Sequence, residues 1–179
     1  MRKHNGIRPH DLVILLQIAL NKNEYVQMKD MANKLFISPS EISTSLQRSV
    51  YSGLVADDRH SIIRESLLKF IIYGLPYTFP TKPGTPAMGI PTGHSAYPLS
   101  NFFNDSEIYV WPYENGEIRG LSIEPYYTNQ PKAVKFNNEL HAVLALTDAI
   151  RLGRKREKNM ASDMLEQILI YRKTTYELS

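Results

Sequence analysis

Residues 28–51 read MKDMANKLFISPSEISTSLQRSVY, and this stretch decides the fold that the sequence predicts. It divides into two short helical segments joined by a tight turn, which is typical of a helix-turn-helix. Ser38 suits the N-cap of the second helix, Pro39 its first helical position, and Glu41 follows the cap by three residues. Apolar residues are expected to pack the two helices together: Ala32, Leu35, Ile37, Ile42 and Leu46.

The outward side of the second helix carries small or polar residues, which suit the edges of bases in a DNA groove. These residues are Pro39, Ser40, Ser43, Thr44 and Gln47. Lys29 and Arg48 are expected to contact phosphates beside them. The first two turns contain no arginine, which favours modest affinity per monomer and therefore a dimer. The alternative is that the spacing reflects only a packed three-helix core, since many helix-turn-helix folds bind protein or serve structure.

Further helices are predicted on both sides of this stretch. A broad apolar face over residues 12–20 indicates a preceding helix, and Gly53 is expected to end the recognition helix. Residues 61–74, SIIRESLLKFIIYG, are predicted as a fourth helix that Gly74 closes. Residues 1–74 are therefore expected to form one helix-turn-helix DNA-binding domain.

The tripeptide GLV at residues 53–55 follows the recognition helix, and the order of elements around it resembles bacterial winged-helix regulators of the MarR type. The resemblance covers roughly residues 7–60 and implies a winged-helix DNA-binding domain. The sequence departs from that pattern in two places. Phe36 stands at the turn where many helix-turn-helix proteins have glycine, and residues 56–60 contain no glycine turn, so the wing is missing or very short.

Basic residues outside the recognition helix are candidates for contacts with the DNA backbone. Arg59, His60 and Arg64 follow the recognition helix closely, with a solvated polar turn as the alternative. The densest basic run, RLGRKREK at residues 151–158, could reach flanking phosphates, but a solvated helix face is favoured. The net charge of +3 and the pI near 9.0 permit nucleic-acid binding without requiring it.

The second half of the chain has a different character. Residues 75–106 are rich in proline and glycine, which excludes continuous helix and most central strands. Several aromatic and apolar residues in this segment favour an ordered connection over a disordered linker. Its portion GIPTGHSAYPL, at residues 89–99, resembles a segment of small bacterial helix-turn-helix proteins of uncertain role, and this resemblance implies no catalytic residue.

Residues 107–179 are predicted to form a hairpin followed by two helices. Residues 107–111 and 118–123 flank Asn115-Gly116, the dipeptide preferred in two-residue hairpin turns. One helix is predicted over residues 138–152, with a second after it, and this region is expected to serve dimerisation or effector binding. The expected fold class is therefore mainly α with a small β-hairpin.

Composition limits the remaining functions. The 179 residues include no cysteine and no apolar run near the length that spans a bilayer, so a cytoplasmic protein without membrane association is expected. His94, beside Ser95, could centre an enzyme site, but the Gly-x-Ser-x-Gly elbow is absent and no histidine pair has metal-ligand spacing. A loop-capping or buried role for His94 is favoured, and no cofactor or metal is expected.

The sequence thus favours a sequence-specific DNA-binding transcriptional regulator, a repressor acting as a homodimer on double-stranded DNA. The C-terminal region would pair the monomers, bind a small effector or contact a protein. One alternative is an antitoxin-like or adaptor protein whose C-terminal region binds a partner protein. A less favoured alternative is the enzyme centred on His94.

Overall fold

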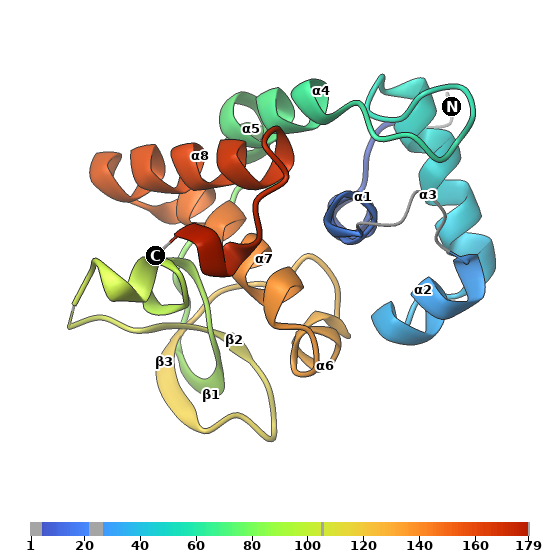
Figure 1. Cartoon of the computed structure of the whole chain (residues 1–179). Helices are drawn as coiled ribbons and strands as arrows, with labels where there is room; N and C mark the ends of the chain where they lie inside the picture. The colour runs from blue at the N-terminus through green and yellow to red at the C-terminus, as the bar shows by residue number, and fades with distance from the viewer. Residues whose placement is uncertain (1–4, 22–26, 105, 179) are drawn as a thin grey trace.

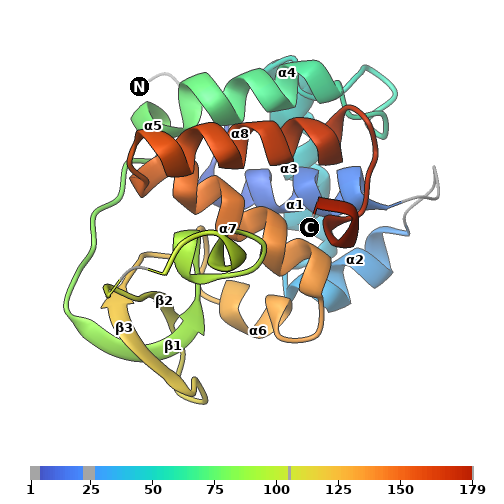
Figure 2. The same cartoon turned by 60° about the vertical axis from the view of Figure 1, so that its left-hand side comes forward.

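Helix α7 (Asn138–Leu152) runs through the middle of the molecule, and the other elements are arranged around it (Figures 1 and 2). The computed structural model describes residues 5–21, 27–104 and 106–178. Helices α1 (Pro9–Leu20) and α8 (Lys155–Leu169) pack directly on α7, and a small three-stranded sheet lies beyond them. The fold is therefore mainly helical, as the sequence predicts, with a small sheet.

Side-chain hydrogen bonds cap the starts of the long helices. Pro9 occupies the first turn of α1, and the Asp11 carboxylate accepts the backbone N–H of Arg8 at 2.8 Å. The Asn137 side chain caps α7 by accepting the N–H of Leu140 at 3.0 Å. In α8 the Glu157 carboxylate accepts the N–H of Arg154 at 3.1 Å. These caps satisfy donors that the first helical turn leaves without an intrahelical partner.

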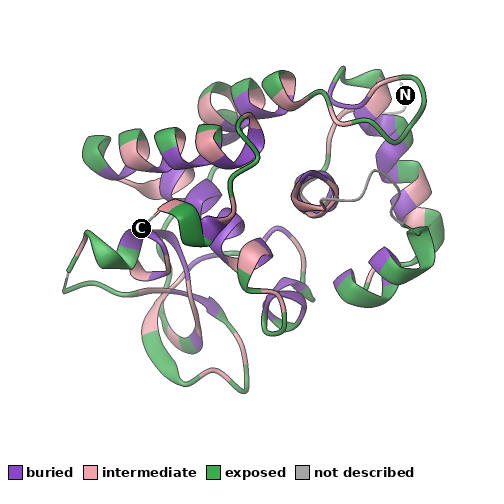
Figure 3. Ribbon diagram, in the orientation of Figure 1, coloured by how far each residue is buried: buried purple, intermediate pink, exposed green. Residues whose placement is uncertain are grey.

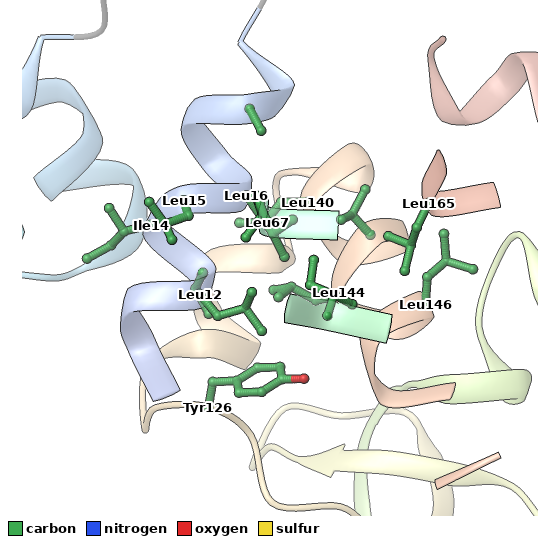
Figure 4. Close-up of a cluster of buried hydrophobic side chains, with 14 of the residues drawn as sticks. Leu12, Ile14, Leu15, Leu16, Leu67, Tyr126, Leu140, Leu144, Leu146 and Leu165 are labelled. Atoms are coloured by element: carbon green, nitrogen blue, oxygen red, sulfur yellow. The ribbon is translucent and has the colours of Figure 1, made fainter. Parts of the chain in front are cut away.

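One hydrophobic core joins the N-terminal and C-terminal halves. Leu12 and Leu16 of α1 point toward Leu140 and Leu144 of α7, and all four side chains are completely buried (Figure 4). Core members come from all three segments expected from the sequence, residues 1–74, 75–106 and 107–179. The three segments therefore share one core.

The two short helices predicted within residues 28–51 form, joined by a tight turn, on the side of α1 away from the sheet (Figure 1). These helices are α2 (Met28–Leu35) and α3 (Pro39–Tyr51), and the Ser38 hydroxyl accepts the N–H of Glu41 at 3.2 Å as the N-cap. Gly53 follows α3 in a left-handed conformation, with φ of 73°. A single antiparallel bridge between Val55 and Ile62 then closes a short loop after α3.

The predicted helix over residues 61–74 has different limits. Helix α4 (Arg64–Lys69) passes through a π-helical turn (Phe70–Gly74) directly into α5 (Leu75–Thr78). Gly74 does not end the helix, because its φ of −102° and ψ of −38° are helical and Ile71 and Leu75 on either side of it are buried in the core. The wider π-turn also accommodates Pro76, which lacks the N–H of a regular helical turn.

The predicted hairpin is wrong. Strand β1 (Pro86–Pro91) pairs antiparallel with both β2 (Tyr109–Pro112) and β3 (Ile118–Ser122), while β2 and β3 run parallel to each other. A two-residue hairpin turn of the preferred type needs positive φ at both central residues. Neither Asn115 nor Gly116 has it, and the turn there is closed by the N–H of Gly116 donating to the carbonyl of Tyr113 at 2.9 Å.

The proline-rich segment supplies β1, which pairs with both of the other strands. Its prolines are compatible with that position because Pro86 and Pro91 stand at the two ends of the strand. Short turns complete the chain: Gly93–Ser95, Leu99–Asn101, α6 (Gln130–Val134) and Thr175–Leu178. Among the residues described, no helix combines the length and apolarity needed to cross a membrane.

Candidate nucleic-acid interface

Helix α3 has one side packed on the core and one side exposed (Figure 3). Ile42 and Leu46 are buried, together with the small side chains of Ser45 and Ser49. The opposite side carries an exposed row with the spacing i, i+4, i+7 and i+11, which places its members along one line of the helix. This row, which we call the α3 stripe, consists of Ser40, Thr44, Gln47 and Tyr51.

The other predicted base-reading residues lie beside the α3 stripe. Pro39 is exposed at the start of the helix, and Ser43 is half-buried on its flank. Lys29 is exposed on α2. The Thr44 hydroxyl donates to the carbonyl of Ser40 at 2.9 Å, so its oxygen keeps acceptor capacity toward the outside.

Arg48 does not lie where the sequence prediction puts it. Its side chain is 7 % exposed, and its guanidinium donates to both oxygens of buried Asp11, at 2.8 Å from Nε and 2.6 Å from Nη2. Nη2 also donates to Glu41 Oε1 at 2.6 Å. The carboxylate of Asp11 raises the pKa of Arg48, and Arg48 lowers the pKa of Glu41. Arg48 therefore fastens α3 to α1, and its guanidinium is buried, which contradicts the predicted role in contacting phosphates.

The same cluster has the composition of a metal site. Ligand atoms of His10, Asp11 and Glu41 lie within 4.8 Å of one another. The guanidinium of Arg48 stands among them, 2.6 Å from each carboxylate and 3.3 Å from His10 Nε2. The positive charge that a metal ion would supply is thus already provided by Arg48, and the cluster is a structural ion-pair network.

Arg59 and His60 are exposed in the short loop after α3. Asp58 orders this loop by accepting the N–H groups of His60 at 2.8 Å and Ser61 at 2.9 Å. The Ser61 hydroxyl also donates to Asp58, and these hydrogen bonds lower the pKa of Asp58 to about 2. Arg59 and His60 thus lie on an ordered loop and remain candidates for contacts with the backbone of DNA.

Arg64 is placed differently from the prediction. Its guanidinium donates to the carbonyl of Ala19 at 2.8 Å and to that of Leu169 at 3.0 Å, at the C-terminal ends of α1 and α8. A helix leaves its last carbonyls without intrahelical donors, so Arg64 caps two helices at once. Partial burial lowers the pKa of Arg64. Its role in the structure is to join helices, and the side chain is not directed at DNA.

The turn between α2 and α3 is held by residues from the other half of the chain. Phe36 adopts a left-handed φ of 54°, which is uncommon for a residue with a bulky side chain. The Tyr127 hydroxyl donates to the carbonyl of Leu35 at 2.8 Å, and the Asn129 amide donates to that of Phe36 at 3.3 Å. Sequence reasoning missed these two residues, because no local pattern indicates a partner more than 90 residues away.

His94 and Ser95 serve the packing of the turn that contains them. Nε2 of His94 lies 2.8 Å from the carbonyl oxygen of Glu107, and the ring stands edge-on to Tyr109. The Ser95 hydroxyl accepts the N–H of Tyr109 at 2.9 Å. A polar cavity of about 390 Å³ adjoins His94 and is also lined by Glu157. The two side chains thus both attach this turn to the segment around β2.

The basic run at residues 151–158 begins at the end of α7 and continues into α8. Arg151 stacks on Tyr126 at 4.5 Å, and Arg156 stacks on Phe103 at 5.3 Å. Residues 154–156 are exposed, in agreement with the favoured prediction of a solvated helix face, whereas the side chain of Arg151 is only 4 % exposed.

Comparison of the chain with protein-family models, with curated proteins and with solved structures found no match.

Proposed function

We propose that this protein is a sequence-specific DNA-binding regulator that places α3 in the major groove. The α3 stripe carries the proposal. Its hydroxyl and amide groups can donate to and accept from base edges, and its spacing aligns them along the exposed side of a helix. The major groove of B-DNA is wide enough to admit such a helix.

The fixed position of α3 supports the same proposal. Buried Asp11 and Arg48 hold α3 against α1, and Tyr127 holds the turn that precedes it. A reading surface benefits from such rigidity, since little side-chain or backbone freedom is then lost on binding. With Arg48 turned inward, the stripe itself contains no arginine, so specificity would rest on Ser40, Thr44 and Gln47.

We infer a homodimer that acts as a repressor by occupying a promoter, because one arginine-free helix supplies few strong contacts. Two copies would place their α3 helices in successive major grooves, about 34 Å apart. Helix α7 is interior along most of its length and is unsuited to pair the monomers, whereas α8 and α4 keep exposed residues.

The test is selection of bound duplexes from a random double-stranded DNA library, followed by measurement of affinity for the selected sequence. The double variant Thr44→Ala/Gln47→Ala is expected to lose about 2 to 4 kcal/mol of binding free energy on that sequence. Its thermal midpoint should stay that of the wild type, because both side chains are exposed.

Asn159→Ala on α8 is the matched control, since it also removes an exposed amide from a helix. It should leave DNA affinity unchanged. Selection of no common sequence by the wild type, or full affinity in the double variant, would contradict the proposal. In that case the exposed aromatic side chains of the C-terminal region, such as Phe136 at 85 % exposure, favour the adaptor function, in which that region binds a partner protein.

A further inference from the structure

Helix α6 lies beside the C-terminal end of α2, at the turn that leads into α3 (Figure 2). The ammonium group of Lys132 stands 4.2 Å from the centre of the Phe36 ring. Asn129, just before α6, donates to the carbonyl of Phe36. These contacts fix α6 relative to the helix-turn-helix, so a group on α6 has a defined place beside the start of α3.

The exposed groups at this place are basic and aromatic. Lys132 and Lys135 are exposed, Phe36 is 41 % exposed and Phe136 is 85 % exposed. The ammonium of Lys135 lies 6.0 Å from the Phe136 ring. We call these four residues the α6 patch. It brings together side chains separated by about a hundred residues of sequence, and the ammonium of Lys135 also lies 6.0 Å from the ring of Tyr113, which follows β2.

The location of the α6 patch decides what it can contact. In a helix-turn-helix the first residues of the recognition helix approach the base edges, so the turn before them comes close to the DNA strand that borders the groove. Phe36 is in that turn, three residues before Pro39. Anything fixed to Phe36 therefore lies near phosphates when α3 occupies the groove.

We propose that the α6 patch is a second DNA contact, in which Lys132 and Lys135 bind the phosphate backbone beside the groove read by α3. The proposal rests on the proposed function. It assigns to the C-terminal half a direct part in binding: α6 adds sequence-independent affinity to a reading helix whose only arginine is buried. Phe36 positions Lys132 through the cation–π contact.

The dependence of affinity on salt measures such contacts, because each neutralised phosphate releases about 0.9 counterions. Affinity for the selected duplex would be measured over a series of salt concentrations for the wild type, Lys132→Gln, Lys135→Gln and the double variant. Each single substitution is expected to reduce the slope of log K against log salt by about one, and the double variant by about two. The affinity loss should be equal on the selected duplex and on one with altered bases.

Two controls fix the interpretation. Lys132→Arg keeps the charge and the ring contact, and should restore the wild-type slope. Lys155→Gln removes an exposed lysine at the N-terminal end of α8, and should leave the slope unchanged. Thermal midpoints of all variants show whether loss of the Phe36 contact affects folding.

The outcomes separate the two proposals. A wild type that binds no selected duplex overturns both. Binding that depends on Gln47 together with an unchanged slope in the Lys132→Gln/Lys135→Gln variant overturns the α6 patch alone. An equal loss of slope in Lys155→Gln also overturns it, since the effect would then reflect total charge rather than place.

Discussion

At the scale of single residues, Arg48 shows how burial decides a role. Its guanidinium neutralises Asp11, whose side chain is completely buried, and removing one partner of such a pair leaves an uncompensated charge. Arg48→Met is therefore expected to lower the free energy of unfolding by about 2 to 4 kcal/mol, measured by urea denaturation. The neighbouring Gln47→Ala, on the exposed side, should change it by less than about 0.5 kcal/mol.

A phosphate-binding arginine would behave in the opposite way, with lost DNA affinity and unchanged stability. The sequence could not separate these roles, because helical spacing places Arg48 next to the α3 stripe and gives no sign of Asp11, 37 residues earlier. Adding Asp11→Asn to Arg48→Met removes the second charge and should recover part of the lost stability. No recovery would contradict an ion-pair role.

At the scale of elements, the sequence predicts the helices, because local chemistry determines where they form. The start of α3 follows from its cap at Ser38, and the positions of α1 and α7 follow from apolar spacing. Strand pairing depends on distant partners, so the sheet could not be predicted in the same way. The Asn115-Gly116 pair favours a local hairpin between the strands on either side of it. In the structure, however, both of these strands, β2 and β3, form their antiparallel pairs with β1.

The structure gives Gly116 a different reason to be glycine. A Cβ there would lie 2.4 Å from the backbone of Gly89 in β1, at a contact where two backbones meet. Gly116→Ala is expected to cost about 3 kcal/mol of unfolding free energy, since backbone must move. Gly53→Ala is the matched control: its φ of 73° is strained, but no atom lies within 4 Å, so about 1 kcal/mol is expected.

Equal losses of about 1 kcal/mol in the two glycine variants would contradict the close backbone contact at Gly116. Chemical denaturation of both variants under the same conditions gives this comparison. A larger loss in Gly116→Ala supports the packing of the 113–117 loop over β1.

At the scale of the whole molecule, the helix-turn-helix depends on the half of the chain that follows it. Helix α1 lies between α3 and α7, and Leu12, Leu15 and Leu16 are all completely buried. Arg64 joins α1 to α8, and Tyr127 and Asn129 hold the turn after α2. The sequence suggests that residues 1–74 form an independent domain. These contacts, in contrast, join the two halves of the chain around one core.

A fragment of residues 1–78, which keeps all of α5, is therefore expected to lack cooperative thermal unfolding. Without α7 and α8, the buried side of α1 is exposed, and each large apolar side chain returned to water costs about 1.5 to 3 kcal/mol. The loss of several such side chains therefore removes most or all of the 5 to 15 kcal/mol that typically separates folded from unfolded domains. Calorimetry should show one transition for the full chain and none for the fragment, and a sharp transition in the fragment would contradict the shared core.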